Sequence, residues 1–200
     1  MALIAVLAVS AVAIAGGSGP KINPVDATIV YTFAEIDMRS CVGAGGKSYT
    51  EQRVRAFGTS EGAGRLTGDA EATLRLLNED STGESFQKGR LVIRDPDTGR
   101  TKAVARFTDA GVAEIFQGVL VGELKPSSKT LIANWRTTFH PNGAITAEIG
   151  GEAADGRLPA IVVKGRCSGP FESSEIELPP PPEDLAGRRA VGLRVGWLNR

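Results

Sequence analysis

The chain has 200 residues, with 23 basic and 23 acidic side chains and a formal net charge of zero. This balance lacks the clustered basic excess of nucleic-acid-binding proteins, so we expect no nucleic-acid partner. The length suits one domain with a single hydrophobic core. The 25 glycines and 11 prolines are more typical of a turn-rich β protein than of a helical bundle.

The N-terminus is almost entirely apolar from Ala2 to Ala15 and is followed by a Gly-Gly-Ser sequence. Small residues at this point are typical of a cleavage site, and the run is shorter than the ~20 residues that a spanning helix needs. We therefore expect residues 1–17 to be a signal peptide, with no stable membrane span after cleavage. The protein would then be secreted or lie in the periplasm or cell envelope. A weak N-terminal anchor is the alternative, because no Lys or Arg precedes the apolar run.

Cys41 and Cys167 are the only cysteines. In an exported chain, an isolated pair of this kind most often forms a disulfide. Two free buried thiols are the alternative, and the absence of a C-x-x-C motif argues against a redox pair.

Residues 24–169 are expected to form the folded domain. Residues 26–40 predict a long strand whose two faces both begin apolar before one becomes charged, which indicates a bend or bulge partway. Residues 49–57 again direct alternate side chains to opposite faces, which predicts a second strand. Residues 65–77 alternate most regularly, although an amphipathic helix is a competing interpretation of their Ala- and Leu-rich part.

Further strands are expected at 86–94, 101–107, 144–149 and 160–166. Between them, residues 111–140 predict a hairpin around Pro126. In its second half Leu131, Trp135 and Phe139 share one face, which we expect to be buried.

About nine strands at regular spacing, with no convincing helix, predict an all-β fold. A single antiparallel β-barrel of about 8–9 strands in a calycin-like meander is the first choice, and a β-sandwich is the second. A Gly-x-Leu-x-Gly pattern, present at 64–68 and at 118–122, favours the barrel. The whole pattern is similar to calycin-like barrels such as the allene oxide cyclase and dirigent families. This resemblance is one of fold, without a shared motif, and it implies a small-molecule isomerase or cyclase.

The composition changes after Pro170. Residues 170–184 are acidic and proline-rich and predict a linker. The tail at 185–200 carries alternating apolar residues, which would suit an extra strand that pairs with a partner's sheet edge or with its own domain. A disordered terminus is the alternative. The alternating residues are Val191, Leu193, Val195 and Trp197.

Three motifs suggest chemistry at first sight, and each has a simpler explanation. Residues 42–48 resemble a phosphate-binding loop, but Cys41 replaces its first glycine and a strand follows in place of a helix. His140 is the sole histidine, which excludes a multi-histidine metal site. The Asp-Pro-Asp-Thr-Gly sequence at 95–99 favours a turn over a calcium loop. We therefore assign no catalytic residue, metal or cofactor.

The ligand-pocket candidates lie mainly on the first two strands. If the polar faces of these strands point into a barrel mouth, they would orient a small ligand. If they point outward, they would form ion pairs on a solvated surface. The candidates are Tyr31, Glu35, Arg53, Arg55 and His140.

These observations predict an exported, non-enzymatic β-barrel that serves as a binding or structural module of the extracellular space or cell envelope. Its partner would be a small apolar ligand or a protein bound through residues 185–200. One alternative is a small-molecule isomerase or cyclase with an allene-oxide-cyclase/dirigent-like barrel. Another is an assembly subunit that uses its C-terminal strand.

Overall fold

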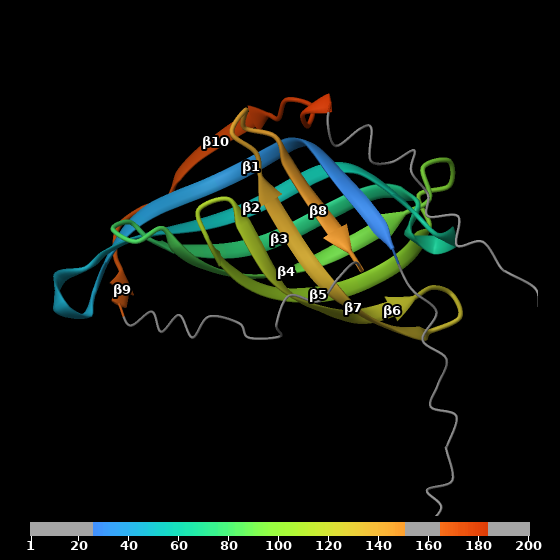
Figure 1. Ribbon diagram of the computed structural model, residues 1–200, viewed down its shortest axis with the longest axis horizontal. Helices are drawn as coiled ribbons and strands as arrows, with labels where there is room; N and C mark the ends of the chain where they lie inside the picture. Colours follow the sequence, from blue (N-terminus) through green and yellow to red (C-terminus); the bar gives the residue numbers. More distant parts are fainter. Residues whose placement is uncertain (1–25, 151–164, 184–200) are drawn as a thin grey trace, which may run out of the picture.

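The computed structural model describes residues 26–150 and 165–183 (Figure 1). The predicted signal peptide, the 185–200 tail and most of the strand expected at 160–166 lie outside these residues. The described residues form ten β-strands, with two short 3-10 helices, Ala44–Gly46 and Gly64–Leu66, in the turns. The strands are β1 Ala27–Gly43, β2 Ser48–Gly62, β3 Gly68–Glu79, β4 Glu84–Arg94, β5 Thr101–Val112, β6 Ile115–Leu124, β7 Lys129–Phe139, β8 Ile145–Ile149, β9 Gly165–Cys167 and β10 Glu172–Glu177.

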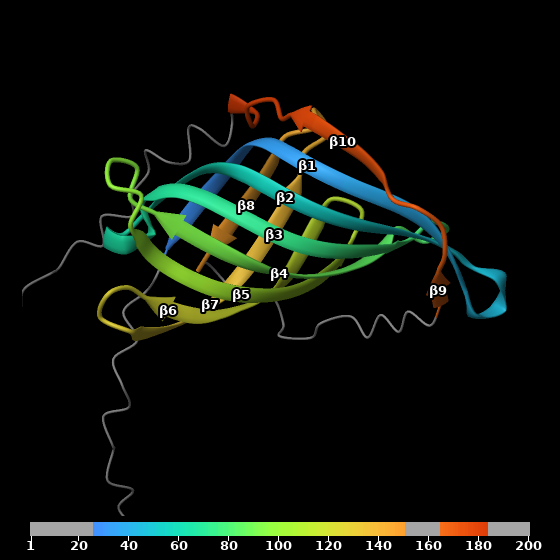
Figure 2. The same ribbon diagram turned by 180° about the vertical axis from the view of Figure 1, so that it is seen from behind.

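Strands β1 to β8 form a closed antiparallel meander. Each strand pairs with the next in the chain, and β8 pairs with β1 to close the barrel (Figures 1 and 2). The predicted all-β barrel is therefore confirmed, with eight strands in the closed ring. The hairpin predicted around Pro126 is also confirmed, as β6 and β7.

β1 is the strand on which the barrel closes. Its first half, Ala27–Tyr31, pairs with β8, whereas its second half, from Phe33 to Met38, pairs with β10. A bulge between Tyr31 and Phe33, where the register with β2 shifts, separates the two halves. The predicted bulge is thus confirmed. The segment expected to be a linker contains a strand, β10, which occupies the edge of β1 that the short β8 leaves open.

Period-2 alternation directs the apolar residues of β1 to β8 into the barrel, as expected for strands with one buried face. Trp135 is 2% exposed and stacks on Phe107, with 4.5 Å between ring centroids. The expected burial of Leu131 and Trp135 is confirmed. Among the described residues, the other large, fully buried apolar side chains are Ile29, Leu66, Leu91, Ile93, Leu120, Leu131 and Ile149.

One end of the barrel is plugged. The turn between β2 and β3 folds inward and places Leu66, 1% exposed, against the core. The Ser60 hydroxyl donates a hydrogen bond to the Leu66 carbonyl at 2.5 Å and holds the plug in place. We call this the closed end, and the opposite end, at the turns after β1, β3, β5 and β7, the mouth.

A C-terminal segment, residues 171–182, runs along β1 at the mouth, and we call it the strap. The Cys41–Cys167 disulfide ties the chain to β1 just before it. The strap is further held by β10, by a Leu178 amide hydrogen bond to the Thr32 carbonyl at 2.9 Å, and by an Asn142 side-chain bond to the Pro180 carbonyl at 3.0 Å. The disulfide predicted from the sequence is therefore confirmed.

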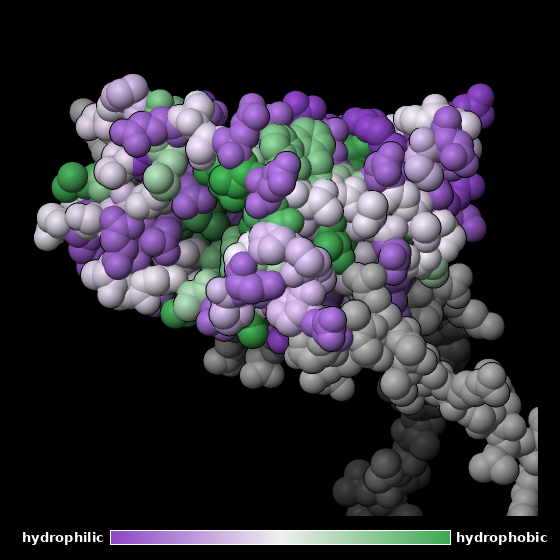
Figure 3. Space-filling model, turned by 90° about the horizontal axis from the view of Figure 1, so that it is seen from above, coloured by the Kyte–Doolittle hydropathy of each residue, from purple (hydrophilic) through white to green (hydrophobic). Residues whose placement is uncertain are grey.

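The face of the molecule that carries β1 and the strap is largely hydrophilic, with smaller hydrophobic areas between (Figure 3). Within residues 26–150 and 165–183, no helix is both long enough and apolar enough to cross a membrane.

Candidate functional site at the mouth of the barrel

A polar cluster lies inside the barrel on its mouth side. One row of cross-strand partners runs from Gln87 on β4 to Asp109 on β5, Gly118 on β6 and Trp135 on β7. Paired residues point to the same face of a sheet, so this register turns all of them into the lumen. Gln87 and Asp109 are both 0% exposed.

Hydrogen bonds join three of the polar side chains. The Gln87 amide nitrogen donates to the Asp109 carboxylate (Oδ2) at 2.7 Å and also contacts the Thr137 hydroxyl at 3.0 Å. The Thr137 hydroxyl donates to the same Oδ2 at 3.1 Å. Three residues distant in sequence are thus fixed together, which helps to specify the strand register.

Gly118 allows Asp109 and Trp135 to face each other. It lies between them in the row, and its lack of a side chain leaves nothing to separate carboxylate and indole. A Cβ atom at Gly118 would lie 1.9 Å from the Thr108 carbonyl oxygen and 2.7 Å from the Asp109 Cβ, closer than atoms can approach. The site therefore requires glycine at this position.

Burial changes the acid–base behaviour of the cluster. Desolvation raises the pKa of Asp109 to about 6, and hydrogen bonds from Gln87 and Thr137 partly offset the rise. The Trp135 indole N–H also lowers this pKa, but its geometry is too poor for a full hydrogen bond. Burial, with a smaller contribution from the negative charge of Asp109, also raises the pKa of Tyr31. Tyr31 is thus a neutral phenol at physiological pH. Asp109 changes its charge at a pH close to the physiological range.

Three buried polar atoms of this cluster lack a hydrogen-bond partner with good geometry among the described residues. They are Asp109 Oδ1, Gln87 Oε1 and Trp135 Nε1. The indole N–H is a donor, whereas the two oxygens are acceptors. A small polar group that accepts one hydrogen bond and donates two would satisfy all three atoms.

The inner wall between this cluster and the mouth is apolar and incompletely buried. Ile36, Val54 and Leu74 point inward from β1, β2 and β3 but are only partly buried against the core. Met38, on the same face nearer the mouth, is 43% exposed. At the closed end, by contrast, the inward-facing residues are almost fully buried, so this wall is less tightly packed on the mouth side.

The structure separates the five residues predicted to line a pocket. Tyr31 is 4% exposed and lies in the lumen. The bulge after Tyr31 turns Glu35 to the outer face, where Arg55 forms ion pairs with Glu35 at 3.8 Å and Glu71 at 2.9 Å. Uninterrupted alternation from Tyr31 would place Glu35 on the same face, but the extra residue of the bulge reverses the alternation.

The other two candidates also lie apart from the lumen. The Arg53 guanidinium stacks on the ring of Phe171 in the strap, 4.2 Å from its centroid. His140 follows β7, and its Nε2 lies 2.9 Å from the Thr146 hydroxyl. Direct ligand contact by any of the five stays a prediction.

A buried acid also lies on the outer face beside the disulfide. Burial would raise the pKa of Glu51, but hydrogen bonds and charges from Arg39 and Arg75 outweigh it and lower the pKa. Both guanidiniums contact its carboxylate, at 2.8 and 2.6 Å. Within the described part of the chain, Glu51 and the two cysteines form the one group of possible metal ligands close enough to share an ion. The disulfide occupies both sulfurs, so this group is not a metal site.

Sequence reasoning missed the lumen cluster. Gln87 and Thr137 occur in different predicted strands, and Asp109 lies two residues beyond the strand predicted at 101–107. Only the register brings the three together. The available signal was a polar residue on the apolar face of a strand, as with Asp109, two residues after the buried Phe107. Gly118, inside a strand, was a second signal.

Comparison with known proteins found no matching family model, no matching curated protein and no matching solved structure.

Proposed function

We propose that this protein is an exported, non-enzymatic binding barrel that takes a small, largely apolar ligand at its mouth. The observation that carries the proposal is the set of three unpartnered buried polar atoms beneath a half-buried apolar wall. Sites for small ligands commonly combine apolar walls with a few convergent polar groups. The ligand would carry one hydrogen-bonding group for Asp109 and Gln87.

The strap supports this proposal because it lies beside the mouth. Leu178 packs against the core, and Ile176 of β10 pairs with the inward-facing Ala34. Ile176 remains 38% exposed. These side chains would complete the apolar wall on the side of the barrel where β8 ends early.

The proposed location outside the cytoplasm rests on the disulfide. An intramolecular disulfide between Cys41 and Cys167 is compatible with a secreted or envelope protein, since such bonds persist in oxidising compartments. The apolar N-terminus adds the sequence pattern of an export signal.

Binding can be tested with N-phenyl-1-naphthylamine, a neutral fluorescent probe with an apolar body and a single N–H. The full-length protein, purified in its oxidised form, should enhance the fluorescence of the probe. A Val54→Trp substitution would fill the inner wall and should weaken binding by about tenfold, the effect of a steric cost of 1–3 kcal/mol.

Val119→Trp provides the matched control, because Val119 lies on the outer face of β6 and is 48% exposed. This variant should bind the probe as the unmodified protein does. Absence of probe binding, or equal binding by both tryptophan variants, would contradict a ligand site at the mouth. Circular dichroism would first establish that both variants fold.

A second candidate function is proton-transfer catalysis of the isomerase or cyclase type, favoured by one observation. The raised pKa of Asp109, about 6, is close to the value that suits a general acid or base at neutral pH. Carboxyl-carbon NMR titration of Asp109 tests this directly. A pKa below 4.5 would remove the candidate, whereas a value near 6 would retain it.

A further inference from the structure

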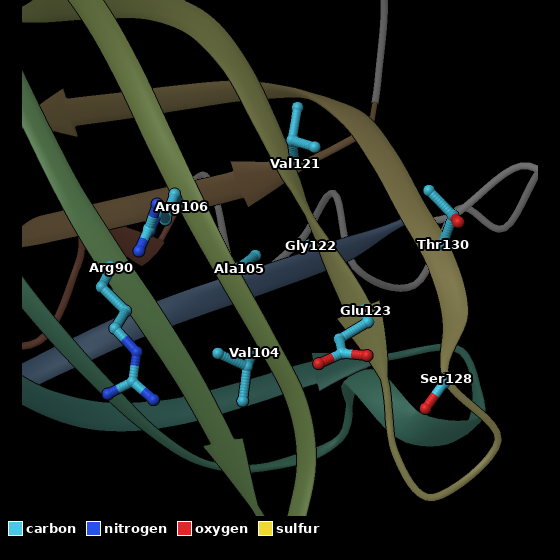
Figure 4. Close-up of a pocket in the computed structure, with 9 residues that line it drawn as sticks. All are labelled: Arg90, Val104, Ala105, Arg106, Val121, Gly122, Glu123, Ser128 and Thr130. Carbon is cyan, nitrogen blue, oxygen red and sulfur yellow. The ribbon is translucent and has the colours of Figure 1, made fainter.

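The outer face of the barrel carries a cleft of about 570 Å³ over β4, β5, β6 and β7 (Figure 4). It is formed by outward-facing side chains and by the turn between β6 and β7, so it is separate from the lumen. Its lining combines two guanidiniums, apolar side chains and two hydroxyls. These residues are Arg90, Arg106, Val104, Val121, Ser128 and Thr130.

The two arginines of the cleft face each other without an acidic partner among the described residues. Arg90 and Arg106 are direct cross-strand partners on β4 and β5, and both are exposed. Neither forms an ion pair within the described part of the chain, whereas Arg136 pairs with Glu148 at 3.8 Å. Like charges directly opposite each other destabilise a sheet, so this pair costs stability unless an anion lies between the two guanidiniums.

The cleft is chemically polarised. Arg90 and Arg106 lie on one side, and the hydroxyls of Ser128 and Thr130 lie on the other (Figure 4). Glu123 lies between them, and Lys125 contacts its carboxylate at 2.6 Å. Guanidinium forks suit an oxyanion, while hydroxyls and a carboxylate oxygen suit the hydroxyl groups of a ligand.

We propose that this cleft binds an acidic carbohydrate. A ligand carboxylate lies between Arg90 and Arg106, and neighbouring sugar hydroxyls exchange hydrogen bonds with Ser128, Thr130 and Glu123. The open, outward-facing position of the cleft suits one segment of a longer saccharide chain. This site is independent of the ligand proposed for the barrel mouth.

The test is isothermal titration calorimetry of the full-length, oxidised protein with tetragalacturonate, with neutral maltotetraose and with inorganic sulfate. The acidic oligosaccharide should bind more tightly than either of the others. The double variant Arg90→Gln/Arg106→Gln should weaken binding by at least about tenfold, the loss expected for one charge-assisted hydrogen bond. Arg136→Gln, which removes an ion-paired arginine from the same outer face, should leave binding unchanged.

A second readout separates a binding role from a structural one. Because removal of either arginine relieves the repulsion between them, the double variant should have a Tm about 1–2 °C higher while binding is lost. Three outcomes would overturn the proposal: no binding of tetragalacturonate, equal affinity for maltotetraose, or unchanged affinity in the double variant. Equal affinity for sulfate would overturn the carbohydrate part and leave a simple oxyanion site.

Discussion

The two ends of the barrel are closed by different means. At the closed end, Leu66 folds in from a short turn and is 1% exposed, among fully buried neighbours. At the mouth, the strap comes from beyond the barrel strands and contributes Leu178, which is only partly buried. The difference shows which end is packed more tightly, because local stability follows buried apolar contact. In the proposed function, the ligand enters at the less tightly packed end.

The polar residues of the interior follow the same division. Asp109, Gln87 and Thr137 lie on the mouth side of the Phe107–Trp135 stack, and the interior towards Leu66 is apolar apart from Ser60. A polar network is costly to bury, so its position beside the accessible end is consistent with a site that exchanges contacts with a ligand.

The stack that separates the two ends should show the largest effect on stability. Trp135→Ala removes an indole that is 2% exposed and leaves Phe107 without its stacked partner. We expect the free energy of unfolding to fall by about 3–5 kcal/mol, as for other large-to-small changes at aromatic core positions. Urea denaturation followed by circular dichroism measures this value, and a loss well below 1 kcal/mol would contradict a core role.

Removal of the disulfide should lower the global stability and, in addition, loosen the mouth locally. The Cys41–Cys167 bond links residues 126 positions apart and anchors the strap to β1. Cys41→Ser/Cys167→Ser should lower the free energy of unfolding by about 2–4 kcal/mol. Amide hydrogen exchange should accelerate in β10 by more than the loss of global stability explains. In the Leu66 turn, exchange should accelerate only as much as the fall in the global free energy of unfolding requires. Equal acceleration at both ends would show that the strap and the plug form one cooperative unit.

A matched pair of leucine substitutions compares the ends directly. Leu66→Ala should cost about 3 kcal/mol, because its methyl groups are fully buried and a cavity would remain. Leu178→Ala should cost about 1 kcal/mol, because its side chain is only partly buried and water can reach the space. Both values come from denaturant titration under identical conditions, and similar losses would mean that the mouth is sealed as firmly as the closed end.

Much of this architecture could be predicted from the sequence because it depends on local pattern. Alternation identified the strands and the buried face with Trp135, and the two lone cysteines indicated their bond. The polarity change along residues 26–40 indicated the bulge that follows Tyr31. The strands and the bulge depend on residues that are neighbours in the sequence, and the disulfide could be inferred from the number of cysteines.

The lumen cluster and the strap could not be predicted in the same way. Asp109, Gln87 and Thr137 meet through a register that four strands define jointly, and a shift of one residue in any strand would reverse its faces. The position of β10 depends on how early β8 ends, which residues 170–184 do not encode. The exact position of the bulge was not predicted either. It places Tyr31 and Glu35 on opposite faces of the sheet, whereas uninterrupted alternation would place them on the same face.

A pH-dependent effect on stability is expected from the charge of Asp109. Its pKa in the folded protein, about 6, exceeds its ordinary value of 3.8, so the folded state binds this proton more tightly than the unfolded chain does. The corresponding stability is present below pH 3.8 and is lost as the pH rises to 6. Asp109→Asn lacks this titration, so its stability relative to the unmodified protein should rise by about 2 kcal/mol between pH 4 and pH 7.

Denaturant titrations at pH 4, 5, 6 and 7 measure this difference. Asp95→Asn is the control, because hydrogen bonds from Thr98 lower the pKa of Asp95 below its ordinary value of 3.8. The folded and unfolded chains both carry this charge through most of the range, so the stability difference for Asp95→Asn should stay nearly flat from pH 4 to pH 7. A flat difference for Asp109→Asn would mean that the Asp109 carboxylate is already ionised at pH 4. The polar floor of the lumen would then be as well solvated as the outer surface, in conflict with the complete burial of Asp109. The desolvated carboxyl group on which the proposed site depends would be absent.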